Sequence, residues 1–414
     1  MPHHDVWSTP VPPALQQQAR EHLARARLAA EHGAEWPPLP VGTPIDQVLA
    51  VVGAGTMGCG IAQCALAAGL HVQLLDTTEA AARRGAERIA ARLASAVARA
   101  RLGSDEPAQR LGRLHASADD RALAQADVVI EAVFEDTATK QALLARLHAA
   151  CPPHTLLLSN TSTLDIDELA SGCGRPDRVA GMHFLTPAHV TPLVEVVHGR
   201  ATSDASLARA RALAQRLGKL PVLAGNAWGF IGNRLFEGYL REVDALQLEG
   251  VSATRIDAAL EAFGFALGPC RTLDMAGTDL VSQVLAARSR RFEQPPAYRR
   301  ITRRLAELGR FGHKSGRGHY LYEGRSAQPD PDLARVCAEE ALALGIAPRP
   351  GISDDAIVRR CVTPLIEEGR RVLAEGMACR AGDIDLVWVL GYGFPAQRGG
   401  PMAMAMASQG PHAG

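Results

Sequence analysis

Two residues in apolar, strand-like segments, His183 and Glu195, carry side chains that can exchange protons near neutral pH. His183 is near the end of the run 178–184, and Glu195 lies within the run 193–197. A carboxylate in such a strand needs a partner, because an unpaired buried charge is costly. A histidine is a natural partner, and the carboxylate would fix its tautomer and stabilise the imidazolium during acid–base work. Taken alone, however, the pair favours a structural ion pair or a core histidine.

Polar side chains at two other places are candidates for holding a carbonyl group. Ser162 lies in the run Asn160-Thr161-Ser162-Thr163, which directly follows an apolar strand. Residues just past the carboxyl end of a parallel strand face the ligand crevice, but a helix cap explains Ser162 or Thr163 equally well. Asn233, one turn into a helix after Gly229-Phe230, would project toward the same crevice, and a cap or an interdomain hydrogen bond again explains it equally well.

A glycine loop, Gly53-x-Gly55-x-x-Gly58, follows a buried strand and opens an apolar helix. Such glycines permit a tight turn and let a pyrophosphate approach the helix N-terminus. A glycine-rich turn without ligand is the alternative, but Asp76 ends the next strand at about the distance of 20 residues expected for a dinucleotide site. Its carboxylate would accept hydrogen bonds from a ribose 2′-hydroxyl and repel a 2′-phosphate, which favours NAD over NADP.

The elements that must position these residues alternate between strands and helices up to about residue 225. Strand-like runs separated mostly by helical patterns predict a doubly wound, Rossmann-type sheet. The runs lie at 48–52, 71–75, 128–132, 155–159, 178–184, 193–197 and 221–223. After Trp228 long helical patterns follow with almost no strand signal until 320–322. We therefore expect an α/β chain: a Rossmann-type domain followed by two tandem all-α domains.

The second helical domain is inferred from an internal repeat. Four dipeptides recur in the same order with an offset that grows from 126 to 132, which indicates a duplicated helical domain whose second copy ends early. They are Glu249-Gly250 and Glu375-Gly376, Ile256-Asp257 and Ile384-Asp385, Gly264-Phe265 and Gly393-Phe394, Gly268-Pro269 and Gly400-Pro401. The expected domains are a helix and linker at 1–45, the dinucleotide domain at 46–225, and helical domains at 226–325 and 326–414.

Composition excludes several partner classes. The 414 residues hold 44 basic and 44 acidic side chains, so the chain has no charge excess that would attract nucleic acid. No apolar run is long enough for a membrane span, and the eight cysteines show no metal-ligand spacing. The chain ends match no address signal, from which we expect a cytoplasmic protein. Only Lys140, Lys219 and Lys314 are lysine, so each lysine is informative.

Together these features resemble the L-3-hydroxyacyl-CoA dehydrogenase family, especially the dehydrogenase part of multifunctional β-oxidation enzymes. The resemblance runs from about Val48 to Met402. Its carriers are Gly53–Gly58, Val129–Glu135, Ser159–Ser162, His183-Phe184 with Pro187, Leu193–Glu195, Gly229-Phe230 with Asn233-Arg234, and Gly312–Gly316.

The resemblance implies specific roles. His183 would take the proton of a 3-hydroxyl group while hydride passes to the nicotinamide of NAD, and Glu195 would orient His183. Ser162 and Asn233 would hold the substrate oxygen and the thioester region. The implied NAD contacts are Met57, Asp76, Glu135, Lys140, Ser162 and Lys314. Two of the three lysines thus fall on family positions, where a compact ammonium suits the site.

The resemblance also has limits and implies partners. Leu185-Thr186 stand where the family has an aromatic residue and an asparagine or serine, and Trp228 replaces a smaller residue. The expected substrate is an acyl-CoA, and because 45 residues cannot hold a hydratase domain, a separate hydratase would be the partner. Packing of the two helical copies within one chain predicts a monomer. The rival hypotheses are a dehydrogenase of another small 3-hydroxy acid and a nucleotide-binding relative without catalysis.

Overall fold

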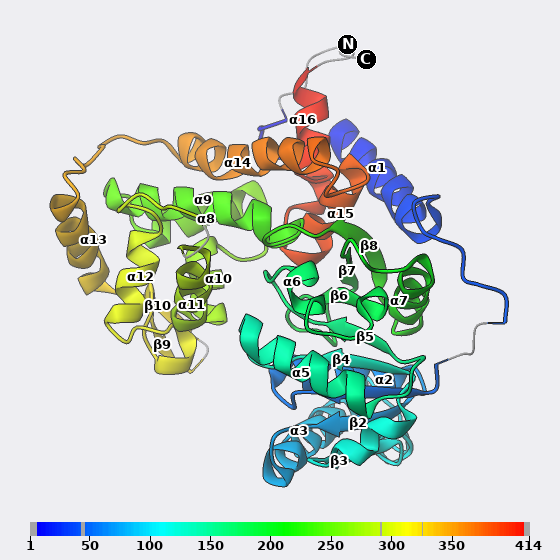
Figure 1. Cartoon of the computed structure of the whole chain (residues 1–414). Helices are drawn as coiled ribbons and strands as arrows, with labels where there is room; N and C mark the ends of the chain where they lie inside the picture. The colour runs from blue at the N-terminus through cyan, green and yellow to red at the C-terminus, as the bar shows by residue number, and fades with distance from the viewer. Residues whose placement is uncertain (1–5, 43–45, 290–291, 325, 410–414) are drawn as a thin grey trace. The chain divides into compact units, whose positions relative to one another are not determined.

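The computed structural model describes residues 6–42, 46–289, 292–324 and 326–409, which form two compact units (Figure 1). The sheet unit consists of Ala24–Gly232 and Val372–Gly391. The helical unit consists of the described residues of Met1–Leu23, Asn233–Arg371 and Tyr392–Gly414. The first and last five residues, on which the expected cytoplasmic location rested, lie outside the described residues.

The sheet unit is built on eight strands in the order β3-β2-β1-β4-β5-β6-β7-β8. The strands are β1 Val48–Val52, β2 His71–Leu75, β3 Leu114–Ser117, β4 Val128–Glu131, β5 Leu156–Ser159, β6 Val179–Phe184, β7 Leu193–His198 and β8 Leu220–Gly225. All neighbours are parallel except β6 and β7. Residues 185–192 are too few for the crossover that a parallel pair requires, so the chain turns back and places His183 directly opposite Glu195.

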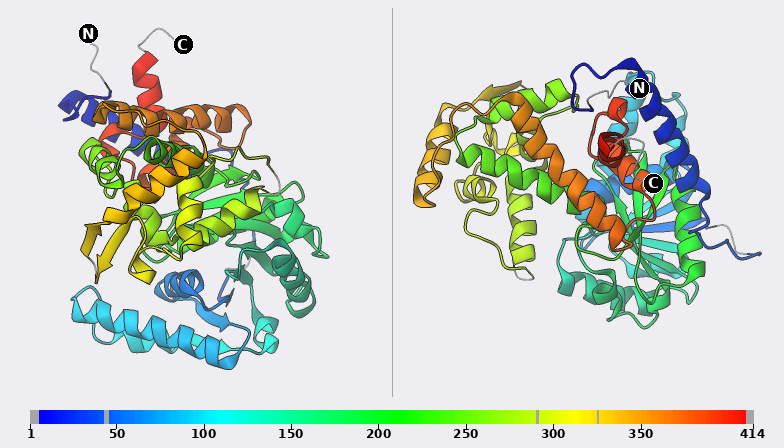
Figure 2. Two further views of the ribbon diagram at one scale, coloured as in Figure 1. Left: turned by 90° about the vertical axis from the view of Figure 1, so that its left-hand side faces the viewer. Right: turned by 90° about the horizontal axis from the view of Figure 1, so that it is seen from above.

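Helices cover both faces of this sheet, which confirms the predicted doubly wound fold (Figures 1 and 2). Helices α2 (Thr56–Ala67), α3 (Glu79–Ala98) and α7 (Asp204–Arg216) share one continuous apolar core with the strands. Helices α5 (Thr137–Ala150) and α6 (Ile166–Ala170) lie on the opposite face. Because both faces are buried, strands such as β1 and β5 read as unbroken apolar runs.

The remaining described elements of the sheet unit are three short helical segments and two longer helices. They are α4 (Glu106–Leu111), η1 (Asp120–Gln125), η2 (Pro176–Arg178), α15 (Ala381–Gly391) and the second half of α1 (Pro13–His32), which runs through both units. Helix α15 contacts β7 and β8. The sequence-based division instead counts it with the second helical copy, and that four-part division stays a prediction.

The helical unit holds Glu249-Gly250, Gly268-Pro269 and Gly400-Pro401 at helix ends, whereas Glu375-Gly376 lies in the sheet unit. Glu249-Gly250 and Glu375-Gly376 follow α8 and α14, while Gly268-Pro269 and Gly400-Pro401 begin α10 and α16. Its helices are α8 (Gly232–Leu248), α9 (Ala253–Phe263), α10 (Pro269–Ala276), α11 (Thr278–Ser289), α12 (Arg300–Glu307), α13 (Pro331–Ala343), α14 (Asp354–Ala374) and α16 (Pro401–Gln409), with η3 (His313–Ser315) and η4 (Ala396–Arg398). The unit also includes a hairpin of β9 (Tyr320–Glu323) and β10 (Ser326–Pro329).

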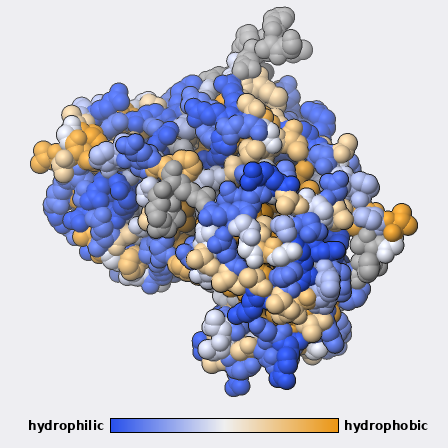
Figure 3. Space-filling view, in the orientation of Figure 1, coloured by the Kyte–Doolittle hydropathy of each residue, from blue (hydrophilic) through white to orange (hydrophobic). Residues whose placement is uncertain are grey.

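The visible surface is mostly hydrophilic, with apolar side chains scattered over it (Figure 3). Every helix in the described part of the chain is too short or too polar to cross a bilayer. The same residues hold no cluster of three or more histidine, cysteine or acidic side chains arranged to bind a metal ion.

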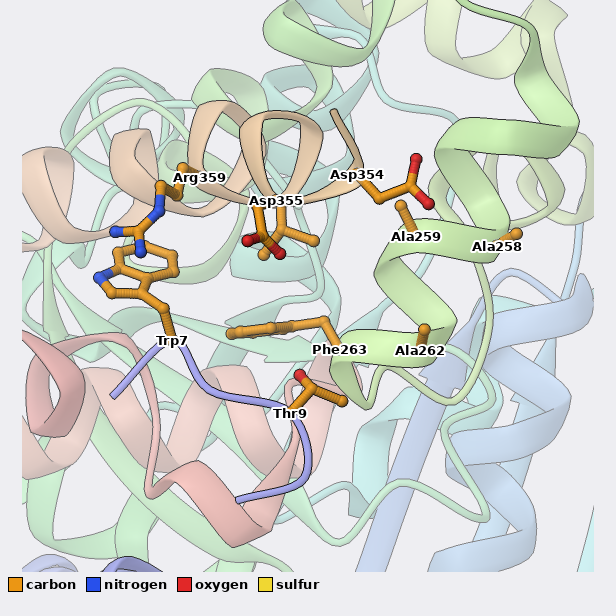
Figure 4. Close-up of a pocket in the computed structure, with 10 residues that line it drawn as sticks. Trp7, Thr9, Ala258, Ala259, Ala262, Phe263, Asp354, Asp355 and Arg359 are labelled. Carbon is orange, nitrogen blue, oxygen red and sulfur yellow. The ribbon is translucent and has the colours of Figure 1, made fainter. Parts of the chain in front are cut away.

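A small pocket of about 180 Å³ lies within the helical unit (Figure 4), and none of the residues predicted to do chemistry lines it. Trp7 and Phe263 form aromatic walls, and Arg359 lies over the Trp7 ring. Arg398 binds the carbonyl groups of Val6 and Ser8 at 2.8 and 3.1 Å, which seats the N-terminal segment against α9. The pocket thus arises where this segment crosses the helices.

Candidate active site

The structure brings His183 and Glu195 together as the sequence suggested. His183 Nδ1 lies 2.7 Å from Glu195 Oε2, and the two side chains are 7% and 0% exposed. The register of β6 and β7 fixes this contact, because the two residues are direct cross-strand partners. Nδ1 therefore donates to the carboxylate. Within the described residues Nε2 has no hydrogen-bond partner, which leaves it as the proton acceptor.

Backbone amides hold the other oxygen of Glu195. The N–H groups of Ile231 and Gly232 each donate to Glu195 Oε1 at 3.0 Å, at the beginning of α8. Three donors on a fully buried carboxylate stabilise its negative charge, and that charge in turn stabilises a protonated imidazole. No side-chain signal marks these amides in the sequence, where the run Gly229-Phe230-Ile231-Gly232 indicates only the start of a helix.

The polar residues that follow β5 make different hydrogen bonds. Asn160 Oδ1 accepts the Phe184 N–H at 2.8 Å, which ties the end of β5 to the end of β6 beside His183. Thr161 Oγ1 accepts the Leu164 N–H at 2.9 Å, and Asp165 caps α6. Ser162 is therefore not the helix cap that the sequence left open.

Ser162 instead binds Glu135. Its N–H and its Oγ lie 2.7 and 3.0 Å from Glu135 Oε1, which also accepts from Thr161 Oγ1 at 2.7 Å. Burial opposes ionisation of Glu135, but the Lys140 ammonium and the bonds from Thr161 and Ser162 outweigh it and lower the pKa of Glu135 below its ordinary value. The Glu135 carboxylate thus fixes where the Ser162 hydroxyl lies.

Lys140 is fully buried behind this group. Its Nζ lies 2.8 Å from both oxygens of Glu131 and 3.4 Å from Glu135 Oε2. Ser159 Oγ makes a further close hydrogen bond to Glu131. Contact of Lys140 with NAD stays a prediction from the resemblance. In the structure the Lys140 ammonium contacts Glu135, and Glu135 in turn binds Ser162.

The glycine loop has the shape that a dinucleotide requires. Gly53 has φ of +103°, and a Cβ there would meet the Ala132 carbonyl oxygen at 2.6 Å. A Cβ at Gly58 would collide with the Gly53 carbonyl oxygen, whereas the space above Gly55 is open to 4 Å. The loop is therefore closed toward the sheet and open at the N-terminus of α2, where a pyrophosphate fits.

The Asp76 carboxylate accepts a hydrogen bond from the backbone of this loop. Its Oδ2 accepts the Ala54 N–H at 2.8 Å, and its Oδ1 accepts the Thr77 N–H at 2.7 Å. The carboxylate therefore lies at the loop with lone pairs left to accept further donors. We expect Asp76→Asn to reduce the preference for NADH over NADPH by about 10- to 100-fold, because one charged acceptor is lost.

The Asp76 prediction is measured as the ratio of the two cofactor dissociation constants by fluorescence titration. The exposed Asp105→Asn, near the start of α4, serves as a control for a general loss of charge. An unchanged ratio in Asp76→Asn would remove Asp76 from cofactor selection.

The two unusual residues after His183 make separate contacts. Leu185 is buried, and its Cδ1 occupies the position where a side chain on Gly391 of α15 would lie. Thr186 Oγ1 lies 3.2 Å from Met57 Sδ, on the helix that opens at the glycine loop. Thr186 therefore contacts one of the expected NAD-binding residues.

Asn233 and Lys314 belong to the helical unit, and their roles stay predictions. Asn233 Oδ1 accepts a hydrogen bond from the Tyr392 hydroxyl at 2.8 Å, a contact that no local sequence pattern indicates. Lys314 Nζ pairs with Asp279 at 2.6 Å and is half exposed. Burial raises the pKa of Asp279, but the bond from Lys314 outweighs it and the net shift is downward.

Comparison with known proteins agrees with this geometry. Residues 48–227 match the family model of the 3-hydroxyacyl-CoA dehydrogenase NAD binding domain, and residues 229–322 match that of the C-terminal domain. A peroxisomal bifunctional enzyme from Danio rerio is 39% identical over 373 residues, 87% of this chain and 51% of that protein. The chain thus spans about half the length of such curated relatives.

Solved structures match over a greater share of their length. The 3-hydroxybutyryl-CoA dehydrogenase from Escherichia coli is 31% identical with a TM-score of 0.74, covering 88% of this chain and 92% of that one. The (S)-3-hydroxybutyryl-CoA dehydrogenase from Ralstonia eutropha is 34% identical with a TM-score of 0.62, covering 67% of this chain and all of that one.

The names of the curated relatives correct one expectation. They are described as peroxisomal or glyoxysomal proteins. The cytoplasmic location expected from the chain ends is therefore contradicted.

Proposed function

The chain belongs to the 3-hydroxyacyl-CoA dehydrogenase family, and from that premise we propose that it interconverts (S)-3-hydroxyacyl-CoA and 3-ketoacyl-CoA. NAD is the cofactor, since the matching model of residues 48–227 is that of an NAD binding domain. The observation that carries the proposal is the buried His183–Glu195 dyad, in which Nε2 is left as the proton acceptor.

The dyad supplies the proton chemistry of this reaction. His183 Nε2 takes the proton of the 3-hydroxyl group as the C3–H bond breaks, and the imidazolium that forms is stabilised by Glu195. NAD bound at the glycine loop would supply the acceptor for the hydride that leaves C3. In the reverse direction His183 returns the proton to the oxygen of the 3-keto group.

Neighbouring residues orient the reacting group. The Ser162 hydroxyl is placed by Glu135 so that it can contact the substrate oxygen. Asn160 holds Phe184, and so fixes the strand end from which His183 projects. Asn233 is assigned to the thioester region, and Met57, Asp76, Glu135, Ser162 and Lys314 are assigned to NAD. These assignments follow the family positions.

Acetoacetyl-CoA is the first substrate to test, because the two solved relatives described above are named for a four-carbon acyl-CoA. We expect the purified chain to oxidise NADH with acetoacetyl-CoA and not with free acetoacetate, measured by loss of NADH absorbance. A series of longer 3-ketoacyl-CoA substrates then defines the accepted chain length. Turnover of the free acid without turnover of the thioester would contradict the proposal and favour a dehydrogenase of small 3-hydroxy acids.

The curated relatives carry a second activity in their names, and it is not part of this proposal. An enoyl-CoA hydratase activity would supply the 3-hydroxyacyl-CoA. Mixing this chain with an enoyl-CoA hydratase and an enoyl-CoA substrate tests that arrangement, with NADH formation in the coupled reaction as the expected result.

A further inference from the structure

The turn that precedes α8 has an unusual backbone. Gly229 and Phe230 are consecutive residues with positive φ, +73° and +51°. Glycine adopts this left-handed region readily, but for a residue as large as phenylalanine it is strained. Phe230 is nevertheless fully buried. Such strain persists only where the surrounding structure enforces it, and it tends to gather at functional sites.

This backbone shape directs two amides at one carboxylate oxygen. The Phe230 N–H closes the turn on the Ala227 carbonyl at 3.0 Å. Beyond Phe230 the successive N–H groups of Ile231 and Gly232 both point to Glu195 Oε1 at 3.0 Å. Consecutive amides that follow a left-handed residue form a concave anion-binding nest. Here the bound anion is the carboxylate of the dyad itself.

The side chain of Phe230 meets the other member of the dyad. Its ring centroid lies 5.8 Å from that of His183, with the ring planes tilted by 57°. The Phe230 ring therefore packs beside the imidazole of His183. The Phe230 backbone sets the direction of the two amides that bind Glu195. A helix start alone would not require this arrangement, because α8 could begin after an unstrained residue.

We propose that Phe230 is a positioning residue for the dehydrogenase reaction, and that its left-handed backbone holds the Glu195 carboxylate while its ring fixes the plane of His183. The inference rests on the proposed function. It assigns a purpose to the strained turn and makes the Gly229–Gly232 segment part of the proton-transfer machinery.

Two substitutions at the same position separate the backbone from the ring. Phe230→Gly removes the ring but accepts a left-handed backbone without strain, so Glu195 keeps its two amide donors. Phe230→Ala removes the same ring contact but keeps a Cβ, so the turn is free to relax away from the left-handed region. We expect Phe230→Ala to lower kcat by about 10²-fold, as misplacement of a reacting group does. Phe230→Gly is expected to lower kcat clearly less. The KM for the acyl-CoA should change little in both variants.

A spectroscopic signal tests the positioning without substrate. The His183 Nδ1 proton bound to Glu195 should give a strongly downfield proton NMR resonance, assigned by its absence in His183→Gln. We expect this resonance to persist in Phe230→Gly and to be lost or broadened in Phe230→Ala. Phe230→Leu, which keeps a buried apolar side chain, serves as a second test if the alanine variant unfolds, and it too should weaken the resonance and kcat relative to the wild type.

The outcomes distinguish this inference from the proposed function. Equal kcat values in Phe230→Gly and Phe230→Ala, with the resonance intact in both, would overturn the positioning role even if the wild type is an active dehydrogenase. A wild type that shows the resonance but does not turn over 3-ketoacyl-CoA would instead overturn the proposed function.

Discussion

Replacing His183 by glutamine is expected to lower kcat by about 10²- to 10⁴-fold, the usual contribution of a positioned general acid–base residue. Glutamine is close to histidine in length and can still donate to Glu195 Oε2 through its amide. It offers no group that is basic enough to take the proton of the 3-hydroxyl. The loss should therefore appear in the chemical step, and the KM for NADH should change little.

The measurement is the steady-state rate of NADH oxidation with acetoacetyl-CoA, together with NADH binding in the absence of substrate. His198→Gln is the matched control, because His198 lies at the exposed end of β7, the strand that carries Glu195. That variant should retain the wild-type rate. Turnover of His183→Gln within a few-fold of the wild type would show that the proton is transferred by another group, and the mechanism proposed above would be wrong.

The His183–Glu195 pair could be predicted from the sequence, but the backbone amides that hold Glu195 could not. His183 and Glu195 lie in short apolar strands, where a titratable residue is conspicuous, and a short connection makes those strands neighbours. The amides of Ile231 and Gly232 lie more than 30 residues from Glu195 in the chain. A backbone donor has no residue type to recognise, and a left-handed phenylalanine has no sequence signature. Such a contact emerges only from the fold.

Two elements show where periodicity was informative and where it was not. Strand β3 was not predicted, because Leu-His-Ala-Ser is a short edge strand without an apolar run. Helix α15 falls in the region 326–414 that was expected to be a second helical domain, but its residues from Asp383 to Trp388 are all buried. Its place in the sheet unit depends on neighbours that no local pattern specifies.

Lys140 illustrates the limit of a resemblance. The family position implies a contact with NAD, while the structure places the ammonium on Glu131 and near Glu135, without exposed surface. In the sequence, Glu131 is distinguished only by lying within the run Val129–Glu135 that matches the family. A buried lysine that pairs with two carboxylates has consequences for folding that a cofactor contact does not have, and these consequences can be measured.

Lys140→Met is expected to destabilise the protein by about 3–5 kcal/mol, because removing one partner of a buried ion pair leaves uncompensated charge. Methionine has nearly the same length and creates little cavity, so the effect reports charge. The measurement is the urea midpoint of unfolding at neutral pH. Lys314→Met is the matched control, since Lys314 pairs with the carboxylate of Asp279 as Lys140 pairs with that of Glu131, but its side chain is 51% exposed, and a surface pair contributes at most about 1 kcal/mol. Equal losses in both variants would contradict the prediction.

The double variant Glu131→Gln with Lys140→Met separates folding from cofactor binding. It removes Glu131 and Lys140 together, so the part of the stability loss in Lys140→Met that is due to uncompensated Glu131 should return. Glu135 then remains without the ammonium that offsets its burial and lowers its pKa. If the double variant is stable but binds NADH weakly, Lys140 acts on the cofactor through the charge and position of Glu135, which also places Ser162. If NADH binding is unchanged, the lysine is there to neutralise Glu131, and the family position reflects the fold more than the cofactor.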